Sequence, residues 1–121
     1  MPEYLIAFND EWVPDQPEEW FQERARILRP IIAEMRQAGV LVFTGGLDDT
    51  FEVFSVDATS GTPVYTDGPF AETKEHLGGF AVVDVPDLES LRHWAGQIAI
   101  GCGWPQQVSR FQRPFQPIEN E

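Results

Sequence analysis

Basic side chains are scarce in this sequence. Its 121 residues include eight lysines and arginines against twenty aspartates and glutamates, which gives a formal net charge of -12 at pH 7. Binding to a phosphate backbone requires a cationic surface, so the composition argues against a nucleic-acid-binding protein. The same deficit argues against docking on anionic lipid. We therefore expect neither nucleic acid nor a membrane among the partners of this chain.

Cysteine and histidine are also rare. Cys102 is the single cysteine, which excludes an internal disulfide and a cysteine-based metal cluster. The two histidines, His76 and His93, stand far apart and form no HxH or HxxxH arrangement. The sequence also lacks a phosphate-binding loop, a dinucleotide fingerprint and a nucleophile elbow. We therefore expect no metal and no cofactor.

Long apolar runs are missing as well. No segment approaches the ~20 consecutive apolar residues that a membrane-spanning helix needs. The N-terminus reads Met1-Pro2-Glu3, and the apolar run that follows is shorter than the core of a secretory signal. These features predict a cytoplasmic protein, and the length suits a single domain over residues 1–121.

What the sequence does contain is two amphipathic segments. Apolar residues spaced by three or four predict a first helix over 15–38, capped by Asp15 and interrupted by Pro30. The same spacing predicts a second helix that begins after Asp87 and ends at 101–103. A short helical turn is also predicted at 72–76.

Short β-rich runs separate these helices. They predict strands at 5–8, 40–43, 80–85 and 107–111, and a hairpin formed by 51–56 and 62–66. Apolar residues on both sides of 40–43 predict a central strand that is covered on both faces.

The resulting order is β-α-β, an inserted hairpin, and then β-α-β. With the hairpin set aside, this is the ferredoxin-like split βαβ plan of the α+β class, with two helices on one face of a four-stranded antiparallel sheet. The other face would stay open in a monomer, and the aromatic residues Phe43, Phe80 and Phe111 indicate that something covers it. A second copy of the chain is the simplest cover, so we expect a homodimer.

The most distinctive stretch runs from Thr66 to Phe80 and reads TDGPFAETKEHLGGF. It resembles the signature of the DGPF branch of the YCII-related (YciI-like) family, and the resemblance extends along nearly the whole chain. It implies a ferredoxin-like fold that dimerises into an α/β barrel, in a family of mostly small bacterial proteins without an established function. An enzymatic role has been suggested for the wider family from a recurrent His and Asp, and some DGPF members are associated with extracytoplasmic-function sigma factors.

One departure concerns the histidine that the YciI-like branch carries on its first helix. The corresponding position lies near Leu28 here, and residues 15–38 contain no histidine. The proposed family mechanism therefore does not transfer directly, and an active histidine in this chain would be His76 or His93.

Asp67 and His76 form the sharpest candidate pair for acid–base catalysis. Histidine changes its charge near neutral pH and shuttles protons, and a nearby carboxylate would hold its tautomer. The structural alternative is that Asp67 and Gly68 make a tight turn while His76 lies exposed beside Glu72.

Four further residues are candidate ligand-binding groups. Lys74 suits an anionic group, Arg113 suits a carboxylate, and Trp12, in a polar loop, suits a planar ligand. Glu72 belongs to the same charged loop as Lys74. Surface ion pairs and ordinary packing are the structural alternatives for all four.

Two functions remain open at this point. One is a small-molecule-binding protein or enzyme that uses Asp67 and His76 as acid and base. The other is a non-enzymatic regulatory or protein-interaction module, for example a sigma-factor-associated one, that acts through an acidic surface. The motif would be purely architectural if it only braces the fold.

Overall fold

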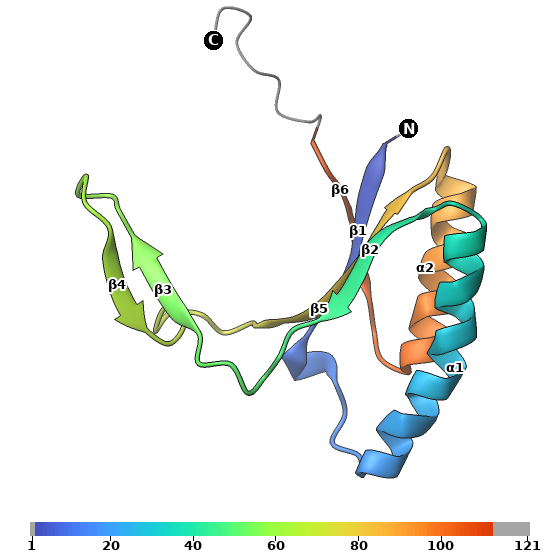
Figure 1. Ribbon diagram of the computed structural model, residues 1–121, viewed down its shortest axis with the longest axis horizontal. Helices are drawn as coiled ribbons and strands as arrows, with labels where there is room; N and C mark the ends of the chain where they lie inside the picture. The colour runs from blue at the N-terminus through green and yellow to red at the C-terminus, as the bar shows by residue number, and fades with distance from the viewer. Residues whose placement is uncertain (1, 113–121) are drawn as a thin grey trace, which may run out of the picture.

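The computed structural model describes residues 2–112 as a four-stranded sheet, two helices and a two-stranded arm (Figure 1). The elements are β1 (Glu3–Asn9), the short 3-10 helix η1 (Asp10–Trp12), α1 (Glu18–Gln37), β2 (Leu41–Gly46), β3 (Phe54–Asp57), β4 (Val64–Asp67), β5 (Leu77–Asp84), α2 (Leu88–Cys102) and β6 (Gln107–Arg110). With β3 and β4 set aside, this is the predicted β-α-β-β-α-β order. The α+β class is confirmed.

The sheet has the strand order β2-β5-β1-β6, and each neighbouring pair is antiparallel. β2 is therefore an edge strand, so the prediction of a central strand at 40–43 was wrong. Val42 and Phe43 are 53% and 57% exposed, which shows that the apolar residues of β2 are not covered on both faces within one chain. Within residues 2–112 the sheet is open and forms no closed barrel.

The helix boundaries differ between prediction and structure at the first helix only. α1 begins at Glu18, because Pro17 takes the N-cap position in an extended conformation, so the predicted cap at Asp15 was wrong. α1 also continues through Pro30 to Gln37. α2 is capped as predicted: the Asp87 carboxylate accepts a hydrogen bond from the backbone N–H of Ser90 at 2.8 Å. No helix forms at 72–76, where the structure has a turn and loop.

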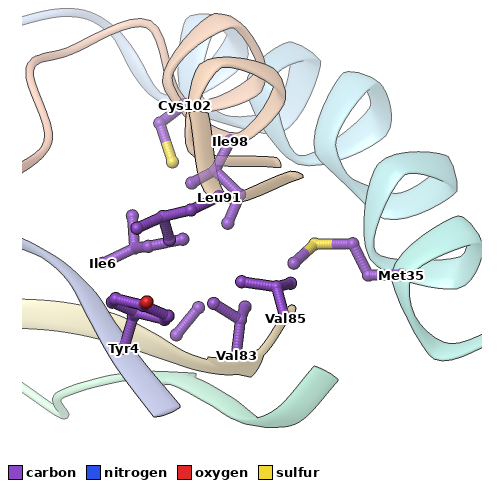
Figure 2. Close-up of a cluster of buried hydrophobic side chains, with 9 residues drawn as sticks. Tyr4, Ile6, Met35, Val83, Val85, Leu91, Ile98 and Cys102 are labelled. Carbon is purple, nitrogen blue, oxygen red and sulfur yellow. The ribbon is translucent and has the colours of Figure 1, made fainter. Parts of the chain in front are cut away.

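Both helices lie on one side of the sheet (Figure 1), and the core lies between these layers. α1 supplies Met35 to this core, and β5 supplies Val83; both side chains are 0% exposed. Figure 2 shows the full cluster of buried side chains from β1, α1, β5 and its following residue, and α2: Tyr4, Ile6, Met35, Ala81, Val83, Val85, Leu91, Ile98 and Cys102.

Gly101 allows the two helices to approach each other. A Cβ atom at this position would lie 2.8 Å from Cδ1 of Leu28 and 3.3 Å from the Leu28 Cα. Such distances are shorter than a carbon–carbon contact, so a larger residue would push α2 away from α1. The packing of α1 against α2 also forms one wall of a cavity between the helices and the sheet.

The face of the sheet opposite the helices is apolar, and no element within residues 2–112 covers it. Phe43 on β2 and Phe80 on β5 lie on this face, with ring centroids 5.8 Å apart, and Leu5 of β1 lies across from Val82. The β3–β4 arm extends away on this side of the molecule (Figure 1). Within residues 2–112, no helix has both the length and the apolarity that crossing a bilayer requires.

Candidate functional site

The start of β5 is tied to the segment that follows β1. The backbone N–H of Asp10 donates to the carbonyl of His76 at 2.7 Å, where the register between β1 and β5 shifts after Phe8. This hydrogen bond holds η1 against the end of the loop between β4 and β5, residues 68–76, which we call the DGPF loop. It therefore brings residues of an acidic loop near the N-terminus to the only histidine of the motif.

Glu11 holds His76 at two points. One carboxylate oxygen lies 2.5 Å from Nδ1 of the ring, and the other accepts the backbone N–H of His76 at 3.1 Å. The hydrogen bond from the His76 side chain, supported by the one from its backbone, lowers the pKa of Glu11 below its ordinary value. Glu11 is therefore an ionised acceptor, and its two contacts fix both the ring and the backbone of His76.

The orientation of the ring follows from this contact. An ionised carboxylate is only an acceptor, so the proton of the neutral ring sits on Nδ1 and the lone pair on Nε2. Among the described residues, Nε2 has no protein hydrogen-bond partner. The side chains of His76 and Glu11 are 42% and 40% exposed, so both groups are in contact with solvent.

His76 borders a hollow of about 520 Å³ between the segment after β2 and the DGPF loop, which we call the loop hollow. Its lining combines carboxylates with aromatic rings and, among the residues that the structure describes, contains no lysine or arginine. The carboxylates are those of Asp10, Asp48, Asp49 and Glu75, and the rings are those of Phe51, Phe54 and Phe70. Asp48 also has a structural role, because it accepts hydrogen bonds from the hydroxyl and the backbone N–H of Thr50, which lower its pKa.

The structure places Asp67 at the end of β4, opposite Phe54 of β3. The next residue, Gly68, has a φ of +82°, and its N–H and carbonyl are held by the Val53 carbonyl and the Ser55 hydroxyl. The carboxylate that contacts His76 is that of Glu11, and Asp67 is not among the residues that line the loop hollow. A catalytic role for Asp67 stays a prediction.

The other predicted ligand-binding residues are dispersed. Glu72 and Lys74 are exposed in the DGPF loop and do not line the loop hollow, and Trp12 is half-buried in η1. Arg113 lies outside the described residues. Residues 2–112 contain no group of three or more side chains arranged to hold a metal ion.

Glu11 is the residue that sequence reasoning missed. Its position directly after the first strand was a usable signal, because the first strand of this plan pairs with the strand that follows the motif. The ends of two neighbouring antiparallel strands meet at one edge of the sheet. This pairing would have placed the acid at residue 11 close to the histidine at residue 76.

Comparison with known proteins supports the resemblance stated above. The model of the YCII-related domain matches residues 12–101 of this chain. The chain is also 31% identical over 99 residues to an uncharacterized protein of Rhizobium meliloti (strain 1021), an alignment that covers 78% of this chain and 77% of that protein. The family has no established activity, so the comparisons identify the family of this chain but not a reaction that it catalyses. On these grounds the chain belongs to the YCII-related family.

Proposed function

We propose that this chain is a homodimeric small-molecule-binding protein that moves a proton through His76 in the loop hollow. The contact between Glu11 and His76 carries the proposal, because it fixes one imidazole in one tautomer at the edge of a hollow. A histidine held by a carboxylate is a recurring device of general acid–base catalysis.

The chemistry follows from the orientation of the ring. Nε2 accepts a proton from the bound molecule, and the resulting imidazolium is stabilised by the ionised Glu11 at Nδ1. The reverse transfer returns the proton from Nε2. Glu11 acts as a positioning residue and does not itself contact the bound molecule.

The lining of the loop hollow selects the class of molecule. The carboxylates of Asp48, Asp49 and Glu75 disfavour an anion, and the Phe51 and Phe70 rings offer flat apolar contact. A neutral or cationic molecule with a planar part, such as an aromatic amine or phenol, fits this lining. Asp67, Glu72, Lys74, Trp12 and Arg113 remain predicted contributors to binding.

The dimer is proposed from the uncovered apolar surface. Phe43 is 57% exposed on the open face of the sheet, and the arm exposes Phe54, Val56, Val64 and Tyr65 by 47–68%. A two-stranded ribbon is at best marginally stable alone in water, so the arm is expected to gain stability from packing on another surface. A second copy would cover the open face with an equally apolar one and would complete the α/β barrel of the ferredoxin-like plan.

The experiment compares the two histidines. Proton and nitrogen NMR spectra of the imidazole rings are recorded while benzylamine or phenol is added. We expect the signals of His76 to shift and those of His93, exposed on α2, to stay in place. His76→Gln should abolish the response and His93→Gln should leave it intact. Equal responses of both rings, or none, would refute the role of His76.

Light scattering tests the dimer separately. The wild type should have twice the chain mass at micromolar concentration, and Phe43→Glu should shift it to the monomer mass because a charge would be buried in the interface. A monomeric wild type would refute the homodimer without bearing on the proton-transfer site.

A further inference from the structure

A second hollow lies between α1, α2 and the helix-facing side of the sheet. It has a volume of about 360 Å³ and shares no lining residue with the loop hollow. We call it the helix hollow; most of its lining is apolar, from Ile6, Phe8, Phe21, Leu28, Ile32 and Ile98. Protein interiors are close-packed with few voids larger than a water molecule, so a space of this size beside the core is a feature of the fold that needs an explanation. Its volume lies within the range of small-molecule sites.

The helix hollow opens to solvent at one end. Ala25 of α1 and Gly46 at the end of β2 line it and are both exposed. Phe8, Phe21 and Trp104 of the lining form an aromatic cluster with Trp20, and the Phe8 and Trp104 rings lie edge to face at 5.2 Å between centroids. An entering molecule would therefore meet rigid aromatic walls.

Two donors of this lining lack acceptors. The Nε atom of Arg24 and the indole Nε1 of Trp104 are buried, and neither has a hydrogen-bond partner among the described residues. Both groups carry an N–H and cannot accept, so only an acceptor satisfies them. Leaving a buried donor unpaired is unfavourable, so a ligand that supplies an acceptor gains affinity from each of these two groups.

Arg24 also supplies a charge. Its guanidinium stacks over the Trp20 ring at 5.5 Å and donates from Nη1 to the Ile100 carbonyl at 3.1 Å. Among the described residues it forms no ion pair, in a chain that carries twenty acidic residues. Within residues 2–112, no carboxylate lines the helix hollow. Burial raises the pKa of the Cys102 thiol to about 11, so this neighbour is neutral at pH 7 and does not compensate the charge.

We propose that the helix hollow binds a small monocarboxylic acid with an apolar aryl or alkyl body. The carboxylate oxygens accept from Arg24 Nε and Trp104 Nε1, and the body lies between α1 and the sheet. A guanidinium matches the planar geometry of a carboxylate, and an apolar hollow without competing acids strengthens that contact. This site is separate from the loop hollow, whose acidic lining disfavours the same ligand.

Titration calorimetry and NMR of the tryptophan indoles, with benzoate and hexanoate as probes, test the proposal. Binding should shift the Nε1 signal of Trp104, and benzamide, which has the same body without the charge, should bind at least about tenfold more weakly. Arg24→Met should weaken benzoate binding at least about tenfold, because it keeps the stem and removes the donors. Arg26→Met is the matched control: Arg26 lies on the same helix, is exposed and pairs with Glu23, so benzoate binding should be unchanged.

Trp104→Phe provides a second variant that keeps the ring and removes one donor. It should weaken benzoate binding about fivefold, and it decides the outcome if Arg24→Met fails to fold. The proposal is overturned if neither probe binds up to about 10 mM. It is equally overturned if Arg24→Met binds benzoate as tightly as Arg26→Met, or if benzamide matches benzoate. None of these outcomes depends on the response of His76 to amines or phenols.

Discussion

The two hollows of this protein differ in how their walls are built. The helix hollow lies between a helix layer and a sheet, and most of its walls are secondary structure. The loop hollow lies mainly between irregular segments and the arm, and its walls are held by single hydrogen bonds such as Ser55 Oγ to the Gly68 carbonyl at 2.7 Å. The helix hollow is lined by Arg24, which forms no ion pair among the described residues, and the loop hollow by carboxylates around His76. Helices and strands therefore surround the cation, and loops that mix aromatic rings with carboxylates surround His76.

The largest test of this comparison is truncation along one face of α1. Met35→Ala removes a fully buried side chain from the packed end and should lower the free energy of unfolding by about 4 kcal/mol. Ile32→Ala should cost only about 2 kcal/mol, because Ile32 lines the helix hollow and has fewer neighbours to lose. Urea denaturation measures both values. Equal losses would show that Ile32 is packed as tightly as Met35 and that the hollow is not a preformed space.

The second test concerns the helix contact behind the helix hollow. Gly101→Ala places a Cβ 2.8 Å from Leu28 and should lower the free energy of unfolding by about 1–3 kcal/mol. Gly96→Ala on the same helix is the control, since a Cβ there meets nothing within 4 Å. Because alanine has a higher helix propensity than glycine, Gly96→Ala should stabilise the protein by about 1 kcal/mol or less. Thermal unfolding measures the stability of both variants. Equal midpoints would contradict a tight contact between Gly101 and Leu28.

The third test moves to the wall of the loop hollow. Gly68→Ala forces an alanine into a φ of +82° and should cost about 1 kcal/mol, although a Cβ there has open space. The loss should appear as faster hydrogen exchange in β3 and β4, with β5 and α1 unchanged. Gly46→Ala, at a residue without positive φ, should leave exchange in the arm as it is. Faster exchange through the whole sheet would contradict an independently held arm.

The smallest expected effect is the pH dependence of the Glu11 contact. The pKa of Glu11 is lowered from its ordinary value of 4.5 in the folded protein, so its contact with His76 stabilises the fold above that pH. This stabilisation declines as the pH falls through the lowered folded value. Urea denaturation of wild type and Glu11→Gln should therefore differ slightly above pH 4.5 and converge below it. Both side chains are two-fifths exposed, which keeps the difference small.

Glu72→Gln is the control for the pH series. Glu72 is exposed in the DGPF loop and forms no ion pair among the described residues, so its stability profile should parallel that of the wild type. If Glu11→Gln and Glu72→Gln gave the same profile, the contact with His76 would contribute nothing specific to stability.

The sequence was informative where a local pattern decides the outcome. Apolar spacing predicted both helices, Asp87 capped α2 as expected, and the order of elements was correct apart from the turn at 72–76. The prediction failed at the start of α1, where Pro17 takes the N-cap position that was expected for Asp15. The prediction also failed at β2, because an apolar strand has the same residue pattern at the centre of a sheet as at an uncovered edge.

The residues of the two hollows differed in how far the sequence could predict them. His76 stood out through its motif, while its partner Glu11 is 65 residues away and was found only through the pairing of β1 with β5. Arg24 carries a weak signal, since it lies three residues from Phe21 and four from Leu28 on the apolar side of α1. Trp104 carries none, because its donor becomes unusual only when burial leaves it without an acceptor.

By itself the sequence determined the acidic charge, the secondary structure and the family of this protein, because each depends on composition, local spacing or an uninterrupted motif. The tertiary structure decided which acid meets His76. It also decided that Arg24 and Trp104 line one hollow, each with a buried N–H that has no acceptor among the described residues. Those relations join residues from η1, α1, the loop before β5 and the segment after α2. They depend on strand order and helix packing, and no local pattern of residues specifies which side chains will share a cavity.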